Sequence, residues 1–280
     1  MSCTELKPAW YNQGLNKNGK RDITFQRRGT QLNPDLYIPC GKCLECTKVK
    51  SRDWGIRILH ESQYHDRNCF LTLTYENAPE HISKPDIQHF LARLRHETGP
   101  IRYYITGEYG PKTNRPHYHA ILFGEDFLGG ARILNDNNDY TNRLLESTWT
   151  HGFVQAAMLT PERAMYCAGY VTKKLDDKNT FTLMSRNPPL GYQWAVDHQD
   201  NVAQRESVVI NGKELPIPAQ YFKWLDTNKK RLHTVDLEEA KQNKQAKANE
   251  QEITMEKLHK KHVARNADRR WQYNSKDHKI

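Results

Sequence analysis

The sequence predicts an α+β fold that is built on an antiparallel sheet. Runs rich in β-branched and aromatic residues, such as CFLTLTY at 69–75, are typical of strands. Between such runs, apolar residues recur at helical spacing, as at positions 87, 90, 91 and 94. The segments IRYYITGEYG (101–110) and PHYHAILFG (116–124) are two predicted strands joined by a short loop. This arrangement favours an antiparallel hairpin.

The chain divides into five predicted segments, separated by shifts in composition. In order, they are an irregular polar arm (1–39), a cysteine cluster with a basic helix (40–66), the core (67–180), accessory loops with a hairpin at Asn211-Gly212 (181–234), and a charged helical tail (235–280).

Four further elements are predicted within the core. Ser83-Lys84-Pro85-Asp86 resembles a helix start, and the apolar positions that follow it extend that helix. Tyr140–Trp149 is predicted as a short helix, and GFVQAAML (152–159) as another strand. Thr160-Pro161-Glu162 combines an N-cap, a first-turn proline and an early acid, so a helix should begin there and run to Leu175.

Size and charge restrict the class of protein. At 280 residues with a net charge of +9, the chain can bury a core, and its basic balance is suited to a polyanionic partner. No apolar run approaches the ~20 residues that span a bilayer, and Met1–Trp10 has no signal-peptide core. We therefore expect a soluble intracellular protein with no membrane partner. The motif G-x-x-x-x-G-K-[ST] does not occur, which argues against an attached helicase domain.

The segment RPHYHAILFG carries a candidate metal site. Because side chains alternate along a strand, His117 and His119 share one face and Tyr118 points to the other. The hairpin brings Glu108, near the end of the preceding strand, beside the two histidines. Two imidazoles and a carboxylate with open positions suit Mg²⁺ or Mn²⁺ better than a closed zinc site. The alternative is a pair of half-exposed strand histidines with no ligand.

The helix predicted after Thr160 carries candidate nucleophiles. On a helical wheel, Tyr166, Tyr170, Lys173 and Lys174 occupy one sector, and a second sector holds Met165, Ala168, Val171, Thr172 and Leu175. A phenol with a pKa near ~10 is a poor nucleophile unless nearby cations favour its anion, and the two lysines supply such cations. The alternative is that the tyrosines only fill the edge of a core.

The cysteines Cys40, Cys43 and Cys46 are spaced C-x-x-C-x-x-C. A ferredoxin-type run needs a fourth cysteine where Lys50 stands, which argues against an iron–sulfur cluster. Three thiolates with His60, His65 or Cys69 can hold a structural Zn²⁺. Reduced thiols lining a turn are the alternative.

The motifs together resemble those of a known family. FLTLTY, then P-H-Y-H before apolar residues, then Y-x-x-x-Y-V-x-K-K on a helix resemble the rolling-circle replication initiators of the HUH endonuclease superfamily. The chain is most similar to the replication initiators of small single-stranded DNA phages, the microviruses of gokushovirus type. This resemblance runs from Pro39 to Tyr273 and includes PCGKCLECTKVKSRDW, TLMSRNPPLGY and VVINGKELPIP.

The resemblance implies a fold, an activity and site residues. The fold is an RRM-like antiparallel sheet with helices on one face, followed by a helical C-terminal extension. The implied activity is nicking of single-stranded DNA at the replication origin through a tyrosine linked to the 5′ phosphate, with later ligation. Carried over by residue, the metal ligands are His117, His119 and Glu108, and the catalytic residues are Tyr170, Tyr166, Lys173 and Lys174.

The resemblance also implies partners and a location. The chain would act in the cytoplasm of the bacterial host cell together with a host helicase and a DNA polymerase. Its oligomeric state stays open, with a monomer as one option. Between the tyrosines stand Cys167, Ala168 and Gly169, where the phage enzymes often have a basic residue. The order in which the tyrosines act therefore stays open.

Two other functions fit part of the sequence. A non-catalytic RRM-like protein would bind nucleic acid by stacking bases on Tyr103, Tyr104 and Tyr118. It would not explain why two tyrosines and two lysines share one helix face. A transposase or conjugative relaxase relative is the other alternative, although relaxases usually place the tyrosine before the histidines.

Overall fold

The computed structural model describes residues 3–17, 19, 21–27, 33–110, 113–173, 180–205 and 207–227. The described residues form two compact units, one ending at Thr47 and the other beginning at Lys48. The predicted charged tail, 235–280, lies outside the described residues. In the described part of the chain, no helix is both long and apolar enough to cross a membrane.

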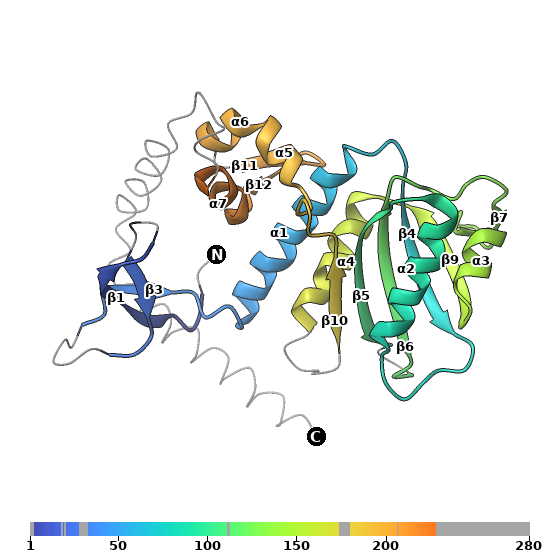
Figure 1. Cartoon of the computed structure of the whole chain (residues 1–280), viewed down its shortest axis with the longest axis horizontal. Helices are drawn as coiled ribbons and strands as arrows, with labels where there is room; N and C mark the ends of the chain where they lie inside the picture. Colours follow the sequence, from blue (N-terminus) through green and yellow to red (C-terminus); the bar gives the residue numbers. More distant parts are fainter. Residues whose placement is uncertain are drawn as a thin grey trace, which may run out of the picture. The chain divides into compact units, whose positions relative to one another are not determined.

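The larger unit is built on a seven-stranded sheet, whose strands pair antiparallel and run in the order β10-β5-β6-β4-β9-β8-β7 (Figure 1). In chain order, the strands are β4 (Asn68–Tyr75), β5 (Arg102–Tyr109), β6 (Pro116–Phe123), β7 (Arg132–Ile133), β8 (Tyr140–Thr141), β9 (Gly152–Met158) and β10 (Phe181–Met184). The predicted α+β class, the antiparallel sheet and the hairpin of β5 with β6 are confirmed. The segment at 140–149 differs from prediction because it begins as strand β8 before its helix.

Helices pack on both faces of this sheet, so the expectation that they cover one face is wrong. On one face, α2 (Lys84–Thr98) and α3 (Arg143–Thr148) pack over the odd-numbered residues of β4. On the other face, α1 (Leu44–Ser62) and α4 (Pro161–Lys173) pack over Phe70 and its strand neighbours. The reason is that central strands such as β4 carry apolar side chains on both faces, and each face needs cover.

A buried hydroxyl network joins the sheet to the start of α2. The Tyr118 hydroxyl accepts from the Ser83 backbone N–H at 2.9 Å and donates to the Ser83 carbonyl at 2.8 Å. It lies 2.7 Å from the Tyr75 hydroxyl, which in turn donates to Asp86 at 2.6 Å. Ser83 caps the helix by accepting from the backbone of Asp86. Tyr118 therefore points away from the two neighbouring histidines, as strand parity predicts.

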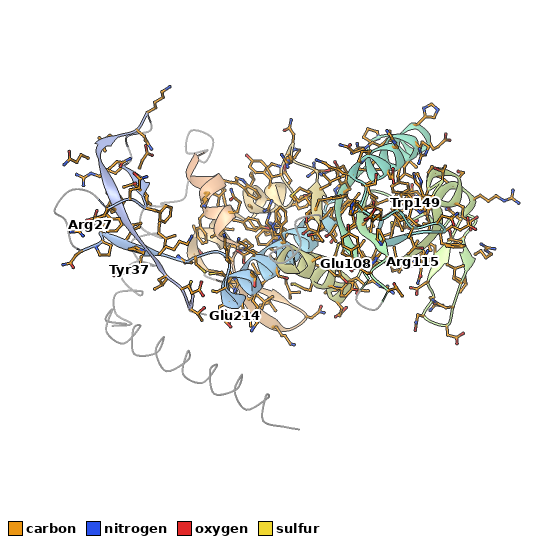
Figure 2. The ribbon with its side chains drawn as sticks, turned by 90° about the horizontal axis from the view of Figure 1, so that it is seen from below. Arg27, Tyr37, Glu108, Arg115, Trp149 and Glu214 are labelled. Atoms are coloured by element: carbon orange, nitrogen blue, oxygen red, sulfur yellow. The ribbon has the colours of Figure 1, made fainter. Side chains whose placement is uncertain are left out.

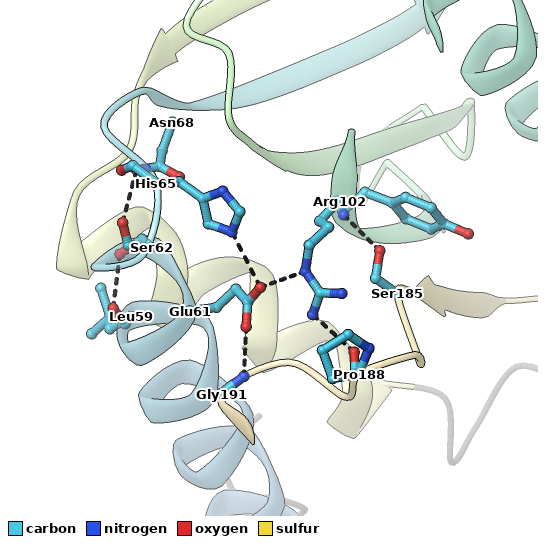
Figure 3. Close-up of polar contacts among 10 residues, drawn as sticks. Leu59, Glu61, Ser62, His65, Asn68, Arg102, Ser185, Pro188 and Gly191 are labelled. Atoms are coloured by element: carbon cyan, nitrogen blue, oxygen red, sulfur yellow. Dashed lines mark hydrogen bonds and ion pairs between the residues drawn. The ribbon is translucent and has the colours of Figure 1, made fainter. Parts of the chain in front are cut away.

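A buried carboxylate on α1 fastens the sheet to the segment that follows β10. Glu61 accepts from Arg102 at 2.5 Å and from the backbone N–H of Gly191 at 2.8 Å, and His65 lies 3.3 Å away (Figure 3). Burial raises the pKa of Glu61, but hydrogen bonds from these three partners outweigh it and lower the pKa. Gly191 has φ of +76°, and a side chain there would meet the Tyr221 hydroxyl.

The residues after Gly191 form a small lobe with its own apolar cluster, centred on Trp194, Val202 and Tyr221. Its elements are α5 (Tyr192–Asp197), α6 (Gln199–Gln204), β11 (Ser207–Ile210), β12 (Lys213–Pro216) and α7 (Ala219–Thr227). The hairpin predicted at Asn211-Gly212 is confirmed, and both turn residues have positive φ, as a tight two-residue turn requires.

The smaller unit corrects the expectation of an irregular arm at 1–39. Strands β1 (Lys7–Leu15), β2 (Arg21–Thr24) and β3 (Leu36–Ile38) form an antiparallel sheet in the order β2-β1-β3. The sequence hides these strands because backbone hydrogen bonds, rather than an apolar stripe, hold them together. The side chains around Tyr37 are sparse compared with those that fill the larger unit (Figure 2).

The hydroxyl of Tyr118 should contribute measurably to stability. The Tyr118→Phe variant removes a group that satisfies the Ser83 backbone and contacts Tyr75. Leaving buried polar groups without a partner costs about 1–3 kcal/mol, so we expect the free energy of unfolding in urea to fall by that amount. Tyr37→Phe makes the same chemical change at an exposed site and should leave the stability unchanged. Equal stability of Tyr118→Phe and the wild type would contradict the proposed role of the network.

Candidate active site

The register of the hairpin places the predicted metal ligands together on one face of the sheet. Glu108 on β5 lies opposite His117 on β6, and Thr106 lies opposite His119. On the other side of β6, the threonines at positions 74 and 72 of β4 lie opposite the same two histidines. The site therefore sits on three neighbouring strands in the middle of the sheet, with no ligand on a loop.

The three side chains come within coordinating distance of one another. An oxygen of Glu108 lies 2.9 Å from Nε2 of His117 and 3.3 Å from Nε2 of His119. The ligand atoms of all three lie within 4.8 Å of one another. Glu108 and His119 are buried, while His117 is partly open to solvent.

Each histidine ring is held from behind. Nδ1 of His117 lies 3.2 Å from the carbonyl of Arg115, which can only accept, so this nitrogen carries the proton. Nε2 of His117 then presents a lone pair to the Glu108 oxygen, and a cation between these two acceptors would relieve their repulsion. Nδ1 of His119 lies 3.3 Å from the Thr72 hydroxyl. A divalent cation therefore suits this donor set, and two oriented imidazoles are ready for it.

The charge of Glu108 is stabilised within the site. Burial raises the pKa of this carboxyl group, but hydrogen bonds from His117, His119 and Tyr170 outweigh that effect and lower the pKa to about 2. A carboxylate that stays ionised across the physiological pH range is what a hard divalent cation requires.

Both predicted tyrosines of α4 lie against His119. The ring of Tyr170 stacks on the His119 ring with centroids 5.2 Å apart, and the Tyr166 ring meets the same histidine at 5.4 Å. The two phenol rings are 4.8 Å apart. The structure thus brings together five of the seven residues that the sequence predicts as catalytic residues or as ligands of the Mg²⁺ or Mn²⁺ site.

The two tyrosines differ in environment. Tyr166 is 54% exposed, whereas Tyr170 is 4% exposed. Burial raises the pKa of Tyr170, and the neighbouring Tyr166 and Glu108 raise it further. The predicted wheel placed both tyrosines opposite the packed face, but Tyr170 is buried. The packed face is centred on Ala164, Cys167 and Ala168, because α4 lies against α1 as well as against the sheet.

The predicted lysines are not part of this geometry. Lys173 is the last residue of α4, and its side chain lies outside the described residues, as does all of Lys174. Their role therefore stays a prediction.

Several residues near the metal ligands escaped the sequence analysis. Arg115 donates to the backbone carbonyls of Tyr75 at 2.7 Å and Glu76 at 3.0 Å, which fixes the carbonyl that orients His117. Arg115 and His117 also line an open pocket of about 440 Å³, together with Thr74, Tyr75, Gly110, Thr113, Pro116 and Phe153. Figure 2 labels Arg115 and Glu108, which both belong to the β5–β6 hairpin. The alternation of Leu and Thr in FLTLTY was the available signal for Thr72 and Thr74.

The surfaces that the non-catalytic alternative needs are largely absent from the described residues. Tyr104 and Tyr118 are fully buried, in the two apolar clusters on opposite faces of the sheet. Tyr103 is half-buried beneath the guanidinium of Arg95. Bases cannot stack on tyrosines that are already covered.

The cysteine cluster belongs to the smaller unit and has a fourth member that the sequence analysis missed. The sulfurs of Cys40, Cys43 and Cys46 gather with that of Cys3, all within 4.8 Å of one another. The expected fourth ligands are engaged elsewhere: His60 lies 2.9 Å from the Tyr221 hydroxyl, His65 contacts Glu61, and Cys69 is in the core of the sheet. Cys3 was missed because it lies far from the other three in sequence.

Comparison with known proteins follows the same central region. The family model for the phage replication-associated protein ORF2 matches residues 68–175, which contain β4, the hairpin and α4. The replication-associated protein VP4 of Bdellovibrio phage phiMH2K is 31% identical over 243 residues, covering 77% of this chain and 75% of that protein. No solved structure matches the chain at a significant level.

Two further relatives extend the comparison. The replication-associated protein ORF4 of Chlamydia phage 1 is 30% identical over 214 residues, covering 66% of this chain and 52% of that protein. The replication-associated protein ORF2 of Spiroplasma virus 4 is 28% identical over 199 residues, covering 62% of each. Because the VP4 alignment spans about three quarters of both proteins and the family model covers the sheet and α4, the chain belongs to the replication-associated protein family of phages.

Proposed function

We propose that this chain is a metal-dependent, site-specific endonuclease and ligase that nicks single-stranded DNA at a phage replication origin and so initiates rolling-circle replication. The observation that carries the proposal is the contact of two tyrosines with a histidine of the Glu108–His117–His119 cluster. A simple structural role for the histidines would not require nucleophiles beside them.

In this proposal, Glu108, His117 and His119 hold Mg²⁺ or Mn²⁺, as HUH enzymes do. Three protein ligands leave open positions for an oxygen of the scissile phosphate, and the bound cation would polarise that phosphate. Arg115 and Thr72 act as positioning residues, because each holds the ring of one histidine by a contact to its Nδ1.

A tyrosine attacks the scissile phosphorus through its phenolic oxygen. The new bond joins that oxygen to the 5′ phosphate, and the bond from phosphorus to the 3′ oxygen breaks. The phenolic proton passes to solvent, and the 3′ oxygen takes up a proton to become the hydroxyl that primes synthesis. One ester replaces another, so the reverse attack by a 3′ hydroxyl ligates DNA without ATP.

We assign the first attack to Tyr166 and the second cleavage to Tyr170. Tyr166 is exposed to an incoming strand, whereas Tyr170 is buried with a raised pKa and a hydrogen bond to Glu108. Lys173 and Lys174 follow Tyr170 in sequence, and we propose that their ammonium groups stabilise the phenolate and neutralise phosphate charge.

The remaining partners follow from this activity. The substrate is single-stranded origin DNA, and we propose that a host helicase unwinds the duplex and a host DNA polymerase extends the free 3′ end. The site of action would be the cytoplasm of the bacterial host. A transposase or relaxase relative could use the same ligands and tyrosines, and the absence of origin-dependent strand transfer would favour it.

The tyrosines should be essential for covalent attachment. We expect the wild type with Mn²⁺ to form a denaturation-resistant adduct with labelled single-stranded oligonucleotides tiled across the replicon that encodes it. The double variant Tyr166→Phe/Tyr170→Phe should form none. Tyr166→Phe alone should lose most of the first adduct, and Tyr170→Phe should keep the adduct but lose strand transfer between oligonucleotides. Gel electrophoresis under denaturing conditions measures both products.

Tyr64→Phe provides the matched control, because Tyr64 is an exposed tyrosine on the loop after α1, where its hydroxyl donates to Asp197. It should react like the wild type. An undiminished adduct in the double variant would overturn the choice of nucleophiles. The opposite pattern in the two single variants would reverse the assigned order.

The threonine behind His119 should tune the affinity for the metal. Thr72→Val removes the hydroxyl at Nδ1 while keeping the shape of the side chain, and loss of such a partner typically weakens metal binding about 10- to 100-fold. We expect the Mn²⁺ concentration for half-maximal nicking to rise by that factor. Thr74→Val is the matched control, because the Thr74 hydroxyl lies 3.5 Å from the Phe153 carbonyl instead. An equal shift in both variants would contradict the role of Thr72.

A further inference from the structure

We propose that Cys3, Cys40, Cys43 and Cys46 bind one structural Zn²⁺ that holds the smaller unit together. This site is separate from the proposed nuclease centre and does not depend on its activity. All four sulfurs lie within 4.8 Å of one another. The sulfurs of Cys3 and Cys43 are 3.8 Å apart, and a tetrahedron with Zn–S bonds of ~2.3 Å has edges of about 3.8 Å.

Backbone amides point at two of these sulfurs, as expected for thiolate ligands. The sulfur of Cys3 accepts from the backbone N–H groups of Glu5 at 3.4 Å and Cys40 at 3.2 Å. The sulfur of Cys40 accepts from Lys42 at 3.4 Å and from Cys43 at 3.2 Å. A neutral thiol is a weak acceptor, whereas a thiolate gains from each such donor. Hydrogen bonds to ligand atoms are also the usual way to orient a metal ligand.

Other roles for four gathered cysteines fit less well. All four are free cysteines, and a disulfide would need sulfurs ~2.05 Å apart. Four thiolates without a cation would repel one another strongly at these distances. Tetrahedral sulfur sites take zinc or iron, and zinc needs no redox partner to remain bound.

The position of the site explains why this unit needs it. Cys3 precedes β1, Cys40 follows β3, and Cys46 lies in the first turns of α1. One ion would therefore join both ends of the three-stranded sheet to the start of the helix. Crosslinks between segments far apart in the chain restrict the unfolded state and stabilise small units.

The apolar core of this unit is too small to replace such a crosslink. Among its described residues, the buried ones are Thr4, Ala9, Trp10, Cys46 and Thr47. Several large apolar side chains remain exposed instead, namely Tyr11, Leu15, Ile23, Phe25, Tyr37 and Leu44. Units this small usually require a metal or disulfides in addition to their core.

Metal analysis of the full chain tests the proposal. The protein is purified under reducing conditions from zinc-supplemented cells, and zinc is counted by mass spectrometry. We expect about one zinc per chain, and the count should survive in His117→Ala/His119→Ala, which excludes binding at the histidine site. Cys3→Ser and Cys43→Ser should lose the zinc, while Cys69→Ala, which removes a cysteine outside the cluster, should keep it.

A second measurement uses the wild type alone and so does not depend on the folding of variants. Alkylation with iodoacetamide, mapped by peptide, should leave Cys3, Cys40, Cys43 and Cys46 unmodified until a chelator removes the ion. Zinc far below one per chain, iron in its place, or a mass showing disulfides would overturn the proposal. Full zinc in Cys3→Ser, or ready alkylation of these four thiols before chelation, would also overturn it.

Discussion

The pairing of β5 with β6 is the constraint on which the rest of the site depends. Glu108 and His117 are directly opposite each other, so their side chains must emerge on the same face of the sheet. A shift of one residue in this pairing would turn Glu108 to the opposite face from the histidines. The register is protected because Tyr118, between the two histidines, is locked into the hydroxyl network beneath the other face. Packing on one face therefore holds the chemistry on the other.

The helices on the second face complete the site by bringing side chains to the histidines. Ala164, Cys167 and Ala168 are small, so α4 can lie close to the sheet, and this closeness lets Tyr170 stack on His119. Gly55 of α1 has the same effect on the far side of α4, because a side chain there would collide with Met165. Close packing of three layers, rather than any single contact, sets the distance between the tyrosines and the carboxylate.

The two units use different means of holding a fold. The larger unit buries aromatic and aliphatic side chains on both faces of its sheet, and its polar groups are paired in networks such as those of Tyr118 and Glu61. The smaller unit exposes most of its large apolar side chains, and four sulfurs gather where its chain ends meet. The contrast follows from size, since a short chain cannot bury enough apolar area to offset its conformational entropy.

Local sequence determined much of what is found here. Alternation placed His117 and His119 on one face with Tyr118 on the other, and the helix signals at Ser83 and Pro161 marked where α2 and α4 begin. These features depend on neighbouring residues, which a sequence displays directly. Tertiary structure decided the burial of Tyr170, the helices on both faces, the strands before Cys40, and the approach of Cys3 to the other cysteines. Each of these depends on contacts between residues distant in the chain, and no local pattern records which distant residues will meet.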